Sequence, residues 1–162
     1  FRYLKVKTFL MNWLHQNIEI TEEVIPEEAV GFIYMITHIP TGKYYIGKKS
    51  LESVRNVKIG VRELKKLKEE RKAAGIGGRA PLKKKVRKAS DWEKYYSSNE
   101  WINEQVKEGK QKEFKREIIQ FCNSKKSLSY YEVYWMFKND VLSDDNSLNG
   151  NILGKFYSKD LV

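Results

Sequence analysis

Residues 31–47 spell GFIYMITHIPTGKYYIG, and this stretch decides the fold. Its two halves are rich in β-branched and aromatic side chains, and a segment with proline and glycine separates them. Such a pattern predicts a β-hairpin. A loop of two or four residues centred on 41–42 would place Tyr34 opposite Lys49 and would put Tyr34 and Tyr45 on the same face of the sheet.

The next segment favours helix. Residues 51–74 are rich in strong helix formers, with apolar residues at steps of three or four and charged residues between them. This spacing predicts a helix over 51–74 that breaks near Gly60. The glycines and the proline of residues 75–81 then predict a loop.

Helix and strand signals alternate in the second half of the chain. Residues 100–109 predict a short helix closed by Gly109, and residues 114–121 predict a third strand. Apolar side chains lie around most of the circumference of a helix predicted over 127–141, so we expect this helix to be buried. Residues 144–155 are rich in Asn, Ser, Asp and Gly and predict a loop.

The composition limits the class of protein. The 162 residues are 41% hydrophobic, which is enough for one compact domain. No apolar run approaches the roughly 18 residues of a membrane-spanning helix. The single cysteine, Cys122, excludes an internal disulfide framework and a cysteine-rich zinc module.

Positive charge is concentrated in one segment. The chain has 31 Lys and Arg against 21 Asp and Glu, a net charge of +10. Residues 55–88 alone hold 14 Lys and Arg against three Glu. A surface patch of one sign attracts an oppositely charged polymer, so we predict that this segment contacts nucleic-acid phosphates. A solvated charged face is the alternative, and the lack of large apolar residues opposite the lysines disfavours a membrane surface.

The hairpin carries two motifs, Gly31-Phe32-Ile33-Tyr34 and Tyr45-Ile46-Gly47, with ten residues between the two tyrosines. Here the sequence resembles the GIY-YIG nucleases, most of all free-standing, homing-type members encoded by large bacteriophages. The resemblance implies an α/β fold with a small three-stranded antiparallel sheet flanked by helices. It also implies an endonuclease that hydrolyses DNA phosphodiester bonds with one divalent metal, Mg²⁺ or Mn²⁺. A phage-encoded member would act in the cytoplasm of the bacterial host.

The resemblance also suggests how the chain is organised. We expect an N-terminal extension over 1–30, a nuclease domain over 31–156 with a basic insertion at 56–90, and a C-terminal tail over 157–162. Residues 1–10 lack the apolar run of a secretory signal, so we interpret them as an extension or a fragment end.

The resemblance gives the motif tyrosines and one arginine catalytic roles. Tyr34 would be the general base, Tyr45 would position water or phosphate, and Arg55, eight positions after Gly47, would lie on the first helix and bind the scissile phosphate. A phenol acts as a base only when ionised, which at pH 7 costs roughly 4 kcal/mol for a pKa of about 10. We expect nearby lysines and the metal to lower that pKa. Alternatively, the tyrosines are ordinary cross-strand aromatics and Arg55 belongs to the basic face.

The resemblance assigns the metal to Glu132 on the later helix. One carboxylate with water and phosphate is a usual arrangement for Mg²⁺. Glu132 also follows Ser129 by three positions, so it could instead cap the start of that helix. For the asparagine of the family we choose Asn151 over Asn149, although either could be a loop residue.

We expect the remaining DNA contacts to come from the tyrosine at position 96 and from cations beside the hairpin and in the basic segment. These residues are Tyr96, Lys48, Lys49, Arg79, Lys83, Lys84, Lys85, Arg87 and Lys88. The predicted partner is DNA and no membrane. A homodimer on the substrate is kept as one alternative, because two-fold symmetry would place two active sites on opposite strands. The competing function is a basic module of the same fold that binds nucleic acid without cutting it.

Overall fold

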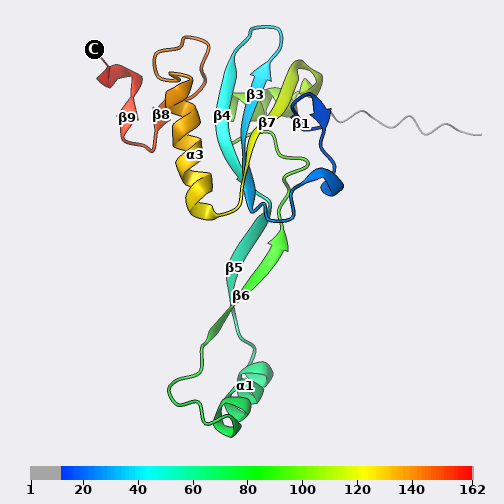
Figure 1. Ribbon diagram of the computed structural model, residues 1–162, viewed down its shortest axis with the longest axis vertical. Coiled ribbons are helices and arrows are strands. Elements are labelled where there is room, and N and C mark those ends of the chain that lie inside the picture. Colours follow the sequence, from blue (N-terminus) through cyan, green and yellow to red (C-terminus); the bar gives the residue numbers. More distant parts are fainter. Residues whose placement is uncertain (1–11, 162) are drawn as a thin grey trace, which may run out of the picture. The chain divides into compact units, whose positions relative to one another are not determined.

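The computed structural model describes residues 12–161, which form a mixed α/β fold (Figure 1). Two compact units share the chain. The core unit comprises the chain up to Leu51 and again from Asp91, and the arm comprises Glu52–Ser90. The expectations for residues 1–10 lie outside the described residues.

The core unit is built on a five-stranded sheet with the order β2-β1-β7-β3-β4. The strands are β1 (Leu14–His15), β2 (Ile18–Glu19), β3 (Gly31–His38), β4 (Tyr44–Ser50) and β7 (Phe114–Cys122). The central β3 pairs antiparallel with both β4 and β7, which confirms the predicted antiparallel sheet. The sheet is larger than predicted, because β1 joins β7 in parallel and β2 joins β1.

The hairpin has a different register from the predicted one. Tyr34 lies opposite Gly47 and not opposite Lys49. The reason is that Gly42, with a φ of 71°, ends the loop and does not occupy its centre. The shift is two positions, so the faces are unchanged and the rings of Tyr34 and Tyr45 lie side by side with centroids 6.3 Å apart.

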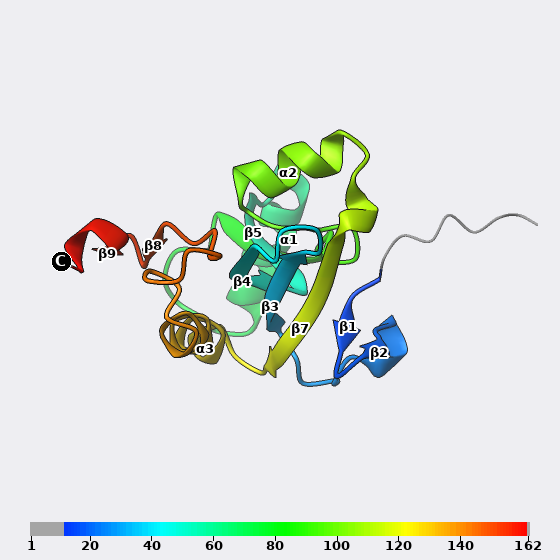
Figure 2. The same cartoon turned by 90° about the horizontal axis from the view of Figure 1, so that it is seen from above.

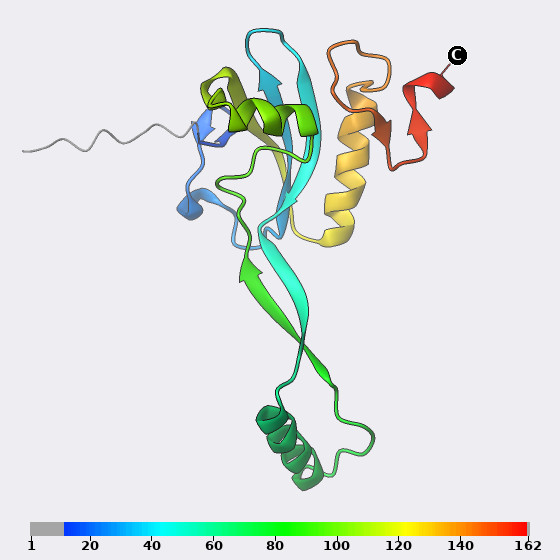
Figure 3. The same ribbon diagram turned by 180° about the vertical axis from the view of Figure 1, so that it is seen from behind.

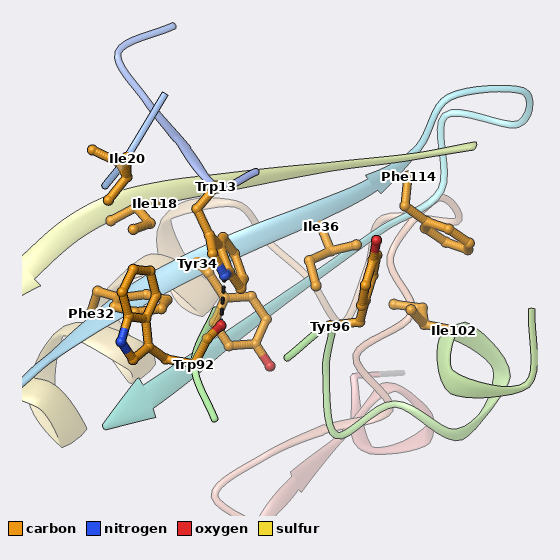
Figure 4. Close-up of a cluster of buried hydrophobic side chains, with 10 residues drawn as sticks. All are labelled: Trp13, Ile20, Phe32, Tyr34, Ile36, Trp92, Tyr96, Ile102, Phe114 and Ile118. Carbon is orange, nitrogen blue, oxygen red and sulfur yellow. Dashed lines mark hydrogen bonds between the residues drawn. The ribbon is translucent and has the colours of Figure 1, made fainter. Parts of the chain in front are cut away.

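Alternate residues of β3 supply the two cores of the sheet. Phe32 and Tyr34 enter one cluster (Figure 4), which the helix α2 (Glu100–Lys107) covers through a buried isoleucine. Ile33 enters the cluster beneath α3 (Lys125–Lys138). Figure 2 shows the two helices on opposite sides of the sheet. Both helices were predicted.

The burial predicted for α3 is wrong. Only Leu128 and Met136 of this helix are buried, whereas Tyr130, Tyr134 and Phe137 are exposed. The helix packs on the sheet along one side only, and its outer aromatic residues remain at the surface.

After α3 the chain is largely loop, as predicted, but it includes one short ladder. β8 (Asn151–Ile152) pairs antiparallel with β9 (Phe156–Tyr157) near the C-terminal end (Figure 3). Single 3₁₀ turns lie at Glu22–Val24, Gln111–Glu113 and Ser158–Asp160.

The arm corrects the prediction of a helix over 51–74. Its first half is a strand, β5 (Glu52–Lys58), which pairs antiparallel with β6 (Lys83–Ala89). The helix α1 (Val61–Ala73) begins only after Gly60, where the predicted break occurs. β5 contains two valines, whose branched side chains suit a strand, and pairing with β6 outweighs the helix propensity of the segment.

The arm has little core and much charge. Across residues 52–90, all of which the structure describes, only Ala80 is buried. These residues hold 14 Lys and Arg against four Glu, so the arm carries a net charge equal to the +10 of the whole chain. Alternate residues of a strand share one face, so the exposed Lys83, Lys85 and Arg87 form a line of cations, here called the β6 row.

Among residues 12–161, no helix has the length and the apolar character needed to cross a bilayer.

Candidate active site

A cleft of about 280 Å³ lies in the core unit between β4, α3 and the segment that contains β8. Its lining includes Tyr45, Glu132 and Asn151, three of the predicted site residues, together with Asn149. Tyr45, Glu132 and the two asparagines come from three different parts of the sequence, and the fold brings these parts together.

The two motif glycines make room for close contacts. A Cβ atom on Gly47 would lie 2.5 Å from the Tyr34 hydroxyl oxygen, and one on Gly31 would lie 2.6 Å from the Lys49 carbonyl oxygen. Real Cβ atoms do not approach this closely. Gly47 therefore lets the Tyr34 ring lie across β4.

Tyr34 is 0% exposed, and it lies in the aromatic cluster beside Trp13, with ring centroids 5.5 Å apart (Figure 4). Its hydroxyl donates to the hydroxyl of Tyr95 at 3.4 Å. Burial, and to a smaller extent the neighbouring Tyr95 and Tyr45, raise the pKa of Tyr34 well above 10. The expected lowering of this pKa by nearby lysines is therefore wrong for the protein without bound metal, because burial is the largest cause and it outweighs the lowering by the main-chain hydrogen bond of Ser98.

Tyr45 lies between Tyr34 and the cleft. Its hydroxyl shares a hydrogen bond of 2.9 Å with Ser98 Oγ. Burial is the main cause that raises the pKa of Tyr45, and the charge of Glu132 adds a smaller contribution in the same direction. Both motif phenols are thus neutral at pH 7, and each contacts the segment that follows the arm.

Glu132 lies near the middle of α3, away from both of its ends, and 18% of its side chain is exposed. Its carboxylate is 2.9 Å from the ammonium of Lys48, which also donates to Ser129 Oγ at 3.1 Å. The helix is instead capped by Ser124, which forms a capping box with Ser127, so the alternative of Glu132 as a cap is wrong.

The chemistry of Glu132 fits a divalent cation. Among the described residues no group of three or more His, Cys, Asp or Glu side chains gathers as a metal site. Mg²⁺, however, is often held by one or two carboxylates and completes its shell with water and phosphate oxygens. Glu132 is an acidic side chain on the lining of the cleft and offers such a ligand, provided that Lys48 releases it.

The two candidate asparagines differ in their contacts. Asn149 is buried, and its amide accepts from Ile46 N at 2.9 Å and donates to Ile46 O at 2.8 Å. It thereby satisfies both main-chain groups at the outer edge of β4. Asn151 is exposed, and its side chain accepts from Gly154 N at 2.8 Å. The amide of Asn149 thus fixes the wall of the cleft, and Asn151 lies on its surface.

Tyr95 is the residue that the sequence analysis missed. It contacts Tyr34, and the ammonium of Lys49 lies 3.9 Å from the centroid of its ring. Lys49 is held in turn by Asp91 at 2.6 Å, which lowers the pKa of that carboxyl. The sequence did hold a signal for Tyr95. Trp92 and Tyr96 are aromatic residues four positions apart, a spacing that indicates that both lie on one buried side of the segment and that Tyr95 lies on another side.

The expectation that Tyr96 contacts phosphate is wrong. Tyr96 is buried in the same cluster as Ile102 (Figure 4). The guanidinium of Arg116 lies over its ring, 4.4 Å from the centroid. Within the described part of the chain its hydroxyl has no hydrogen-bond partner. A phosphate has no access to this phenol.

The predicted cations divide between the two units. Lys48 and Lys49 belong to the core unit. Arg55, Arg79 and the predicted cations of β6 belong to the arm. Arg55 is exposed and lies on β5 opposite Val86, so the expectation that it lies on a helix is wrong.

Comparisons with known proteins gave one finding. A family model described as the GIY-YIG domain of the putative endonuclease segE matches residues 13–160. The match includes the N-terminal segment that contributes β1 and β2, as well as the arm. No curated protein and no solved structure matches the chain.

Proposed function

The chain belongs to the GIY-YIG endonuclease family, and from this premise we propose that it is a divalent-metal-dependent endonuclease that hydrolyses DNA phosphodiester bonds at the Tyr45–Glu132 cleft. The observation that carries the proposal is that Tyr34 packs against Tyr45, and Tyr45 lines the same cleft as the carboxylate of Glu132. Hydrolysis of a phosphodiester needs an activated water and stabilisation of charge on the phosphate oxygens.

Tyr34 is the general base in this proposal, and Tyr45 positions the attacking water or the phosphate. With a pKa raised above 10, ionising Tyr34 at pH 7 costs more than the roughly 4 kcal/mol of a free phenol. The bound metal would bring positive charge, and this charge must offset the cost. The rate of cutting is therefore expected to rise with pH across the neutral range, because the ionised fraction of a phenol with a high pKa increases about tenfold per pH unit.

Glu132 is the metal ligand in this proposal, with Mg²⁺ or Mn²⁺ as the metal. The bound cation would neutralise charge that develops on the phosphate. Lys48 holds the carboxylate in place until the cation arrives, and its released ammonium then becomes available to a phosphate oxygen.

The arm is the DNA-retaining element of the proposed enzyme. Its exposed cations, including the β6 row, Arg55 and Arg79, would contact backbone phosphates and release counterions from the DNA. Lys49 of the core unit, whose ammonium lies over the ring of Tyr95, adds a cation near the site.

Nicking of supercoiled plasmid in Mg²⁺, measured at enzyme excess, tests these roles. Tyr34→Phe should slow cutting by about 100-fold or more, as expected when a general base is lost. Glu132→Gln should cause a loss of similar order by removing the metal ligand. Both variants should retain DNA in a low-salt mobility-shift assay. Glu104→Gln, an exposed glutamate on α2, is the matched control and should cut normally.

Binding without cutting by the wild-type protein in Mg²⁺ and in Mn²⁺ would refute the endonuclease and leave the non-cutting module. Equal loss of DNA retention in Tyr34→Phe and Glu132→Gln would instead refute their assigned catalytic roles.

A further inference from the structure

The hydroxyl of Tyr34 lies behind other side chains. The residue is 0% exposed, and the hydroxyl donates to that of Tyr95. Tyr95 is itself partly exposed. A proton that moves between the Tyr34 oxygen and an attacking water therefore has a route through the Tyr95 oxygen.

We propose that Tyr95 is a further catalytic residue of this site, which relays the proton of the attacking water to Tyr34. This inference rests on the proposed function. The ionised Tyr34 oxygen takes the proton of Tyr95 as the Tyr95 oxygen takes a proton from water. The water oxygen forms the new bond to phosphorus, the bond from phosphorus to the departing sugar oxygen breaks, and that oxygen takes a proton from solvent. Tyr34 ends protonated and Tyr95 ends as it began.

The surroundings of Tyr95 support a fixed position for its phenol. Arg116, 1% exposed, donates to the main-chain oxygens of Glu93 at 2.9 Å and Tyr95 at 2.8 Å. A guanidinium is costly to bury unless its donors are hydrogen-bonded. Here the planar array of donors of Arg116 holds the main chain of the segment that carries Tyr95 in place. On the other side, Lys49 lies over the ring and Asp91 holds Lys49.

The same arrangement places charge where the reaction needs it. The ammonium of Lys49 lies 3.9 Å from the ring centroid of Tyr95. It attracts a phosphate oxygen toward the hydroxyl of Tyr95, which is the group that accepts the proton of the attacking water. The 3.4 Å between the Tyr34 and Tyr95 oxygens is longer than an ordinary hydroxyl pair. Such contacts are often long before substrate binds and tighten in the reactive complex.

Tyr95→Phe tests the relay, because it removes the hydroxyl and keeps the ring. We expect it to slow nicking by about 100-fold or more at unchanged DNA retention. The matched control is Tyr96→Phe, which removes the neighbouring phenol oxygen that makes no hydrogen bond and should cut within about twofold of wild type.

Tyr95→Ala distinguishes a relay through the Tyr95 hydroxyl from a merely structural role of Tyr95. Removal of the ring opens the Tyr34 hydroxyl to water, so Tyr95→Ala should cut faster than Tyr95→Phe although it loses more packing. Alkaline titration of tyrosinate absorbance, which requires no substrate, should also show that Tyr34 titrates nearer to pH 10 in Tyr95→Ala than in Tyr95→Phe.

Normal cutting by Tyr95→Phe overturns the relay. So does an unchanged Tyr34 titration in Tyr95→Ala, which means that Tyr95 does not shield the hydroxyl. If Tyr34→Phe is slow while Tyr95→Phe is normal, the relay alone fails. If both cut normally, the base assigned under the proposed function fails as well.

Discussion

The substitution Gly47→Ala probes the tightest contact of the site. The new Cβ would lie 2.5 Å from the hydroxyl oxygen and 2.7 Å from Cζ of Tyr34. The phenol must retreat by roughly 1 Å to reach ordinary van der Waals distance. It has little room to do so, because it is 0% exposed and packs against Trp13 and Tyr95.

Overpacking of a filled core typically costs about 1–3 kcal/mol. For a protein of this size that corresponds to a fall in melting temperature of roughly 2–12 °C. The effect on cutting should be larger, because a displacement of about 1 Å at a catalytic group is enough to lose about 100-fold in rate. Circular dichroism melts and single-turnover plasmid nicking measure the two effects separately.

Two comparisons make the reasoning refutable. Gly77→Ala places its Cβ in open space without a positive φ, so its melting temperature should stay close to that of wild type. Tyr34→Phe removes the atom nearest to the new Cβ, so Gly47→Ala should cost less stability in the Tyr34→Phe background than in wild type. Equal costs in both backgrounds, or a Gly47→Ala protein as stable as Gly77→Ala, would mean that Gly47 is not there to make room for the phenol.

Three further outcomes follow from the same contacts. Asn149→Ala leaves two main-chain groups of β4 unpaired and should lower the free energy of unfolding by about 2–4 kcal/mol in urea titrations. Asn151→Ala loses one exposed hydrogen bond and should lower it by less than about 1 kcal/mol. Similar losses in the two variants would contradict the separate roles of the two asparagines. The pKa of Tyr34 is raised in the folded state, so its contribution to stability is complete below about pH 10 and is lost as pH rises further. The melting temperature of Tyr34→Phe should therefore fall less steeply above pH 10 than that of wild type. Parallel falls in melting temperature would contradict this. Changing the three cations of the β6 row to glutamine should reduce the slope of log affinity against log salt by about 2.7, and an unchanged slope would mean that the row does not contact phosphate.

The local pattern was enough to predict most of the core unit. β-branched and aromatic runs fixed β3, β4 and β7, and Gly109, at a φ of 85°, closed α2 as its sequence position predicts. The register of the hairpin could not be obtained from the pattern, because alternation is unchanged when partners shift by two positions. The place of Gly42 in the loop decides that shift, and it depends on the loop conformation.

The failures have a common cause, which is pairing between distant segments. β5 carries helix-favouring spacing but becomes a strand because β6 pairs with it. β1 has two residues and joins the sheet through β7, about 100 positions later in the chain. For the same reason, Tyr95 and Tyr96 could not be told apart as site residues: which of the two phenols faces Tyr34 depends on how Arg116 of β7 holds their segment.

The division of charge explains how one small chain could separate retention from chemistry. The arm carries a net charge of +10, and the remainder of the chain holds equal numbers of basic and acidic residues. Retention on DNA through phosphate contacts is therefore assigned mainly to the arm, and it is insensitive to base sequence. The core unit has no net charge, and it holds a buried phenol whose ionisation is unfavourable. Under the proposed function, a base of this kind remains inactive until a metal bound at the cleft supplies the missing positive charge. Cutting would then depend on the metal and on correct placement of the phosphate at the cleft, and not on DNA binding alone.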